Sequence, residues 1–158
     1  MAQSPNPFNI ATGDHPVPHP CCSQAFEIAS AHLPEEDWEE LQALVETADT
    51  ALLQFECFTL PDSDAIGFKL LSTPWTDQHL GQYWRYELST LQALQATEGF
   101  SEETIRVLTL AAQAEVRFLV IDPNSNVLDG LPLFDCWPPS TLAGNARWVF
   151  PMLYGERT

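Results

Sequence analysis

Residues 116–121, VRFLVI, constrain the fold more than any other part of this sequence. The run is rich in branched and aromatic side chains, contains no turn residue, and stops at Asp122 before a loop dense in Pro, Asn and Gly. A short apolar run bounded by turn residues is typical of a strand that is buried on both faces of a sheet. The chain must therefore supply other strands to pair with this one, and helices to cover the sheet.

Three more segments have the length and composition of strands. The segment AFEIASA at 25–31 alternates loosely, with Phe26 and Ile28 on one face. The segments ALLQFECFTL at 51–60 and AIGFKLLS at 65–72 are separated by Pro-Asp-Ser-Asp, which is a turn sequence. We therefore predict that these last two strands pair as a hairpin.

Helical periodicity occurs in three places. The segment 34–48 begins with Pro34, which suits the first turn of a helix, and three acids follow where the helix dipole favours negative charge. Its apolar residues recur at three- and four-residue spacing and form one stripe, made of Trp38, Leu41, Val45 and Ala48. A second helix is predicted at about 77–97, and a third runs from Ser101, its N-cap, to about 115.

The order of these elements is strand, helix, strand, strand, one or two helices, strand. This is the β-α-β-β-α-β order of ferredoxin-like proteins, with 77–97 as an extra helix, and it predicts the α+β class. We expect helices on one face of a small antiparallel or mixed sheet. A chain of 158 residues suits a single domain, which we place at 25–137. Residues 1–24 form a proline-rich arm, and residues 138–158 form an irregular tail packed on the domain.

The charge of the chain limits its partners. Acids outnumber bases 22 to 6, which gives a net charge of −16, and Lys69 is the only lysine. Such a chain repels nucleic acid and anionic membranes and attracts basic proteins, although an acidic surface also serves solubility alone. We expect no direct nucleic-acid or membrane contact. No basic leader and no apolar run of roughly 20 residues occurs, so we expect a cytoplasmic protein with free thiols.

The predicted helix at 34–48 concentrates the acidic charge. Like charges at four-residue spacing cost a few tenths of a kcal/mol each, so this helix has either a solvated face or a basic partner. Rows of carboxylates can also resemble the phosphates of a duplex. The predicted acidic binding face consists of Glu35, Glu36, Asp37, Glu39, Glu40 and Glu46.

Asp122, at the end of a strand, is the first catalytic candidate. Aspartates at such positions serve as nucleophiles in α/β enzymes. Here, however, the residue two positions on is the amide Asn124, no lysine follows Lys69, and Asp also accepts backbone hydrogen bonds in turns. A turn residue is therefore the favoured interpretation of Asp122.

His32 offers a second route to chemistry. Ser30, His32 and Asp122 make a triad on paper, but no G-x-S-x-G elbow is present. A structural or capping histidine is favoured, and we assign no catalytic residue. The alternative function, a small hydrolase or transferase, requires His32, Asp122 and Asp129 to converge on one polar pocket.

No cofactor or metal is predicted. The stretch HPVPHPCC at 15–22 holds zinc-type ligands, but it lacks the C-x-x-C spacing of structural zinc sites. Neither a phosphate-binding P-loop nor a dinucleotide-binding G-x-G-x-x-G is present.

Two sequence motifs resemble those of a known family. They are SAHLPEEDWEEL at 30–41 and VRFLVIDPNSNVLDGLPLFDCW at 116–137. The chain resembles a family of small acidic bacterial proteins of unknown function, often carried on plasmids and other mobile elements. Its members have a Ser/Thr-Ala-His phrase after the first strand and a Leu-Pro…Asp-Trp phrase near the end. Here Cys136 separates Asp135 from Trp137. The resemblance implies a mobile-element setting and no particular chemistry.

These observations favour a binding protein over an enzyme. We expect a small acidic inhibitor or adaptor that engages a basic partner, either a nucleic-acid-binding or a host-defence protein, with mimicry of nucleic-acid charge as one route to binding. A monomer and a homodimer that pairs through the edge of its sheet are both compatible with the sequence.

Overall fold

A computed structural model describes residues 22–47 and 50–134. The predicted tail at 138–158 and all but the last three residues of the predicted arm at 1–24 lie outside the described residues.

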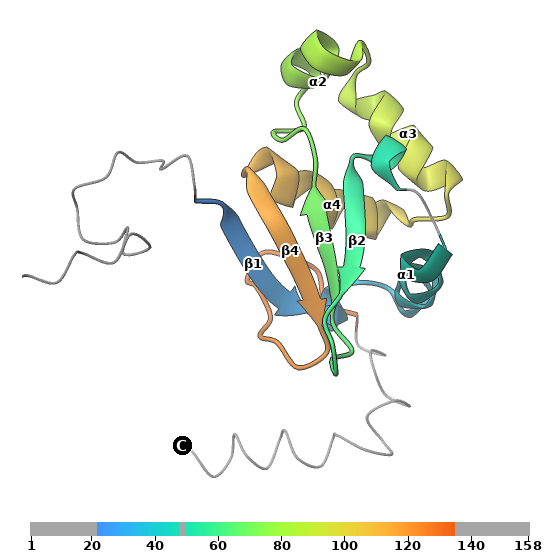
Figure 1. The fold of residues 1–158 in the computed structure, drawn as a ribbon, viewed down its shortest axis with the longest axis vertical. Helices are drawn as coiled ribbons and strands as arrows, with labels where there is room; N and C mark the ends of the chain where they lie inside the picture. The colour runs from blue at the N-terminus through green and yellow to red at the C-terminus, as the bar shows by residue number, and fades with distance from the viewer. Residues whose placement is uncertain (1–21, 48–49, 135–158) are drawn as a thin grey trace, which may run out of the picture.

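Four strands form one mixed sheet, shown in Figure 1. The strands are β1 (Gln24–Ala29), β2 (Phe55–Thr59), β3 (Ile66–Leu70) and β4 (Val116–Asp122), and they lie in the order β1-β4-β3-β2. The predicted hairpin is confirmed, because β2 and β3 pair antiparallel. Strand β4 also pairs antiparallel with β3, whereas β1 runs parallel to β4. The VRFLVI strand is therefore interior, and β1 is an edge.

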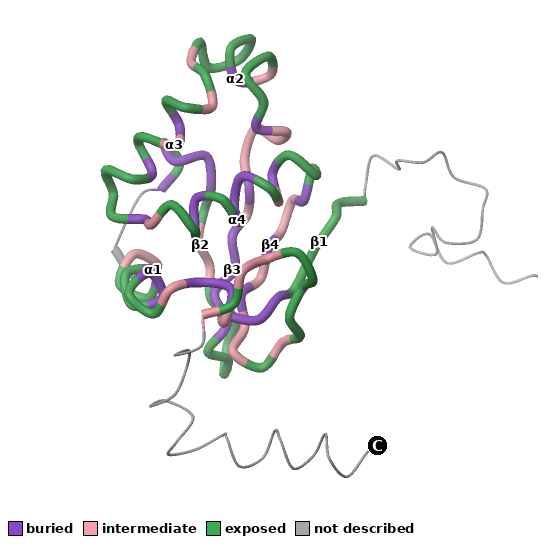
Figure 2. The backbone as a smooth tube through the Cα atoms, turned by 180° about the vertical axis from the view of Figure 1, so that it is seen from behind, coloured by how far each residue is buried: buried purple, intermediate pink, exposed green. Residues whose placement is uncertain are grey.

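The helices confirm the predicted α+β class. They are α1 (Glu35–Thr47), α2 (Asp77–Trp84), α3 (Leu88–Thr97) and α4 (Glu102–Gln113). Two short 3-10 turns are also present: η2 (Ser30–His32) follows β1, and η3 (Ala51–Leu53) precedes β2. Helix α4 crosses one face of the sheet, behind it in Figure 1 and in front of it in Figure 2. Helix α1 lies beside β2, at the opposite edge of the sheet from β1.

The single helix predicted at 77–97 is two helices. Arg85 adopts a left-handed conformation, with φ of 60°, and ends α2. The Asp77 carboxylate then accepts the N–H of Leu88, 2.8 Å away, at the start of α3. The Trp84 indole also donates to the hydroxyl of Ser72. Periodicity alone did not reveal this break, because the apolar spacing continues across it.

The core lies between the sheet and its helices. Leu119 and Ile121 of β4 are buried there, as is Trp75, whose indole N–H donates to the carbonyl of Leu71. Phe55 contacts Phe68 and Phe100 edge to face. Each large apolar side chain of this kind contributes about 1.5–3 kcal/mol through burial, and this burial drives the folding of the domain.

The other face of the sheet explains why β4 is less buried than predicted. No helix of the described residues covers this face, which is turned toward the viewer in Figure 1. Phe118 and Val120 are half-buried there. The ring of Phe58 lies over Gly67, so close that a Cβ on that residue would come within 2.1 Å of the ring. Close packing on this face therefore depends on cross-strand contacts.

Candidate functional site

Five glutamates of α1 form an acidic surface on the molecule. All five are exposed, and we call them the acidic surface: Glu35, Glu36, Glu39, Glu40 and Glu46. Since an α-helix turns about 100° per residue, these positions lie within about 140° of the helix circumference. The buried residues Trp38 and Leu41 lie on the opposite side. These five residues are exposed, as a binding face requires, and their role in binding stays a prediction.

Asp37 departs from the prediction, because it is buried. Its side chain is 4% exposed, and its carboxylate accepts the backbone N–H of Ser101 at 3.1 Å and the hydroxyl of Ser101 at 2.5 Å. Ser101 is the N-cap of α4 and also accepts the N–H of Thr104. Asp37 therefore ties α1 to the start of α4. Its four- and seven-residue spacing to Leu41 and Leu44 is compatible with burial, but the sequence does not indicate the contact with Ser101.

A shallow hollow of about 350 Å³ lies beside the acidic surface. Its walls come from α1 and from the turn before α4. It is lined by Glu36, Asp37, Glu39, Glu40, Ala43 and Gly99.

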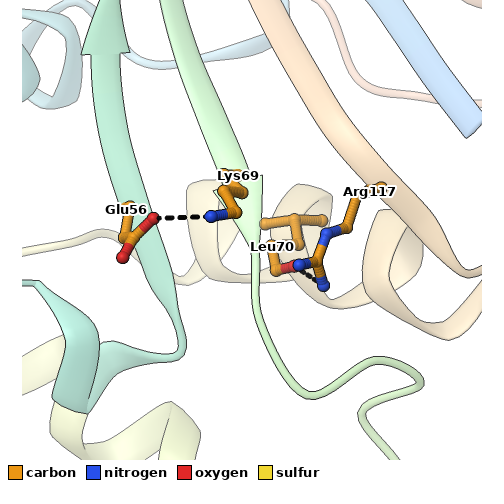
Figure 3. Close-up of polar contacts among 4 residues, drawn as sticks. All are labelled: Glu56, Lys69, Leu70 and Arg117. Atoms are coloured by element: carbon orange, nitrogen blue, oxygen red, sulfur yellow. Dashed lines mark hydrogen bonds and ion pairs between the residues drawn. The ribbon is translucent and has the colours of Figure 1, made fainter. Parts of the chain in front are cut away.

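The acidic surface is electrostatically unsatisfied within the described part of the chain. An ion pair lies on the sheet instead, where Lys69 of β3 pairs with Glu56 of β2 at 3.2 Å, as Figure 3 shows. The guanidinium of Arg117 donates to the carbonyl of Leu70, also on the sheet. No basic side chain of residues 22–47 and 50–134 pairs with a glutamate of α1. The field of these carboxylates is therefore directed at solvent or at a partner.

His32 is fully buried and holds the chain that follows β4. Its Nε2 accepts the N–H of Leu128 and its Nδ1 donates to the carbonyl of Pro132, each at 2.8 Å. The two backbone partners fix the tautomer, because an N–H can only donate and a carbonyl can only accept. Neither ring nitrogen is free to act on a substrate.

Asp122 is a turn residue. Its side chain accepts the N–H of Asn124 at 2.8 Å, and its carbonyl accepts the N–H of Ser125. Asp129 is exposed and follows the residue that His32 binds. No described contact joins His32 to either carboxylate. The geometry therefore offers no observation in favour of the hydrolase or transferase alternative.

No metal centre is formed by the described residues, because no group of three or more His, Cys, Asp or Glu side chains converges there. The same residues include no helix long and apolar enough to cross a membrane. Two thiols are described, an exposed Cys22 and a partly buried Cys57 of β2, and both are free. Burial raises the pKa of the Cys57 thiol from 9.0 to about 12.

We expect Cys57 to react with iodoacetamide about 1000-fold more slowly at pH 8 than an unperturbed thiol, because the reactive thiolate falls tenfold for each pKa unit. The rate is measured in a chain with Cys21, Cys22 and Cys136 replaced by serine. The control keeps only Cys22. Denaturant should bring the two rates together. Equal rates in the folded state would contradict the burial of Cys57.

The raised pKa of Cys57 also links the stability of the fold to pH. Because burial favours the neutral thiol, its contribution to stability is complete below pH 9 and is lost as the pH rises toward 12.

The fold and surface define a small α+β domain that presents an acidic helix. The family model described as "Family of unknown function (DUF5983) C-terminal domain" matches residues 25–136. This match spans most of the chain, so the protein belongs to the DUF5983 family. No curated protein and no solved structure matches it.

Proposed function

We propose that this protein is a small cytoplasmic inhibitor or adaptor whose acidic surface on α1 engages a basic protein. The observation that carries the proposal is the group of five exposed glutamates without basic partners among the described residues. The net charge of −16 adds a long-range field that accelerates the approach of a positively charged protein.

The spacing of the glutamates supports mimicry of nucleic-acid charge. Glu35 and Glu46 are separated by about 16 Å along the helix axis, at a rise of about 1.5 Å per residue. Five charges over this length average one per about 4 Å, arranged as two adjacent pairs, 35/36 and 39/40, and a single charge at residue 46. One strand of a DNA duplex carries a charge every ~3.4 Å along its axis. A cleft that binds one strand of a duplex is therefore a suitable partner surface.

The nature of the partner follows from the same chemistry. A nucleic-acid-binding protein presents rows of Lys and Arg, which match a row of carboxylates. The resemblance of the chain to bacterial proteins carried on mobile elements supports a host-defence protein as the target. We assign no enzymatic activity to the protein.

The test is capture of a partner from a bacterial extract by the immobilised full chain at about 50 mM and 500 mM salt. The changed variant carries Glu35→Gln, Glu36→Gln, Glu39→Gln and Glu40→Gln. We expect capture at low salt by the parent chain, with at least a tenfold loss in the variant, since each weakened charge contact costs a few tenths of a kcal/mol or more.

A matched control distinguishes the effect of the acidic surface on capture from the effect of a lower net charge. It removes the same number of charges at exposed positions elsewhere, through Asp62→Asn, Asp64→Asn, Glu87→Gln and Glu103→Gln. This control should retain capture. Equal loss in both variants would contradict a specific surface. Release of the captured protein by duplex DNA supports mimicry, and unaffected capture in excess duplex argues against it.

A further inference from the structure

Strand β1 leaves part of its outer edge open. It pairs on one side with β4. On its other side, the N–H of Ala29 donates to the carbonyl of Asn126, and the carbonyl of Ala31 accepts the N–H of Phe134, each at 2.9 Å. The chain that follows β4 therefore closes the carboxyl end of the β1 edge. The amino-terminal half of the strand is left without such a neighbour among the described residues.

The backbone N–H and C=O groups of successive residues in a strand point to alternate sides, and this alternation shows which residues of β1 face the open edge. Because the N–H of Ala29 points outward, the backbone groups of Glu27 and Ala25 point outward too. No backbone contact of residues 22–47 and 50–134 satisfies them. Two residues thus offer two N–H and two C=O groups to an added strand.

An apolar pocket lies directly beside this open edge, on the face of β1 that is turned to α4. Its volume is about 150 Å³, and all of its lining side chains are apolar. Its mouth is formed by three unusually exposed side chains: Phe26 at 42%, Leu110 at 43% and Leu128 at 41%. Its floor includes Ile28, Val116 and Leu119. The volume is suited to a single branched or aromatic side chain.

We propose that β1 and this pocket bind an extended peptide segment of a partner protein, which adds to the sheet as a fifth strand. Backbone pairing with Ala25 and Glu27 would hold the segment, and every second side chain would face the α4 side of the sheet, where one of them would enter the pocket. The segment carries apolar residues at alternate positions. This inference does not depend on the acidic surface, because α1 and β1 lie at opposite edges of the sheet in Figures 1 and 2.

The acidic residues near the pocket indicate that the remaining positions of the partner's peptide are basic. Three exposed acids adjoin the pocket residues in sequence: Glu27, whose carboxylate also accepts the hydroxyl of Ser125, Glu115 and Asp129. Two arginines of the neighbouring elements make contacts elsewhere: Arg106 of α4 lines the groove between α3 and α4, and Arg117 of β4 donates to the carbonyl of Leu70 on β3. A second copy of the chain is a poor occupant, because two molecules of net charge −16 repel each other.

The test uses a capped seven-residue peptide in which Ile and Val alternate with Lys, titrated into the full chain. One control peptide has the same composition with its apolar residues grouped, and another has Glu in place of Lys. We expect the alternating basic peptide alone to bind. At saturation, hydrogen exchange of the Ala25 and Glu27 amides should slow by roughly tenfold or more, the factor that 1.4 kcal/mol of protection represents.

Two pairs of variants localise the binding. Leu128→Lys should weaken it by roughly tenfold or more, because it places a charge at the apolar mouth, whereas Leu94→Lys, at a comparably exposed leucine on α3, should not. Glu27→Pro should weaken binding relative to Glu27→Ala, because it removes an outward N–H donor.

Three results would overturn the proposal. The first is equal binding of the alternating and grouped peptides. The second is prior protection of the Ala25 and Glu27 amides in a monomeric free chain, which would mean that the chain covers its own edge. The third is a dimer in light scattering that Leu128→Lys dissociates, which would assign the edge to a second copy.

Discussion

Replacement of Asp37 by alanine should lower the free energy of unfolding by about 3 kcal/mol, the largest effect expected of any acidic residue on α1. The buried carboxylate accepts two hydrogen bonds from Ser101, and hydrogen bonds to a charged group are stronger than those to a neutral one. Its removal leaves the N–H and hydroxyl of Ser101 without their acceptor at the junction of α1 and α4.

The measurement is urea unfolding, monitored by the fluorescence of the buried tryptophans. Glu36→Ala is the matched control, because Glu36 lies in the same helical turn and is exposed. It should change stability by less than about 0.5 kcal/mol. Asp37→Asn keeps one acceptor oxygen and should lose less than Asp37→Ala.

A double-mutant cycle tests the contact itself. Ser101→Ala removes the hydroxyl partner and also the cap that accepts the N–H of Thr104. If Asp37 acts through Ser101, the double variant should be more stable than the sum of the two losses predicts, by about 1 kcal/mol or more. Simple additivity would show that Asp37 stabilises the chain in some other way.

Replacement of His32 by alanine should cost about 4 kcal/mol. The change leaves the partly buried N–H of Leu128 and carbonyl of Pro132 without the ring that pairs with them, at about 1–3 kcal/mol for each group, and adds a cavity where the fully buried ring stood. It should also accelerate hydrogen exchange at the Leu128 amide in particular, because the ring accepts that N–H.

Conservative variants separate the two bonds of His32. In His32→Gln the amide oxygen can replace Nε2 as the acceptor for Leu128, whereas in His32→Asn the amide nitrogen can replace Nδ1 as the donor to Pro132. Each should recover part of the lost stability. The control His79→Ala removes a half-buried ring that contacts Tyr83 and should cost less. Unchanged exchange at Leu128 in His32→Ala would contradict the role assigned here.

His32 also connects the fold to the proposed peptide site. Leu128 forms part of the pocket mouth, and its backbone is held by the histidine ring. A looser segment at 128–132 would widen the pocket and weaken peptide binding. The Ser-Ala-His motif therefore holds in place one wall of the pocket beside β1.

The elements of this fold could be predicted because their patterns are local. The strand at VRFLVI, the hairpin of β2 and β3, and helix α1 from residue 35 follow from period, turn residues and capping. The break at Arg85 was missed, because it depends on contacts of Trp84 and Asp77 with residues outside the helix. The half-exposed face of β4 was missed because sequence does not report how many layers cover a sheet.

The sequence by itself determined the charge of this protein, the α+β order of its elements and the turn at Asp122, since each depends on residue types and on neighbours a few positions away. Only the tertiary structure decided which polar groups are used internally and which face outward. Asp37 and Glu36 are adjacent acids of one helix, yet the first binds Ser101 and the second faces solvent. The same holds for the partly open edge of β1 and the pocket beside it. Burial and pairing depend on contacts between segments that are far apart in the chain, so which groups are buried or paired is decided only in the folded structure.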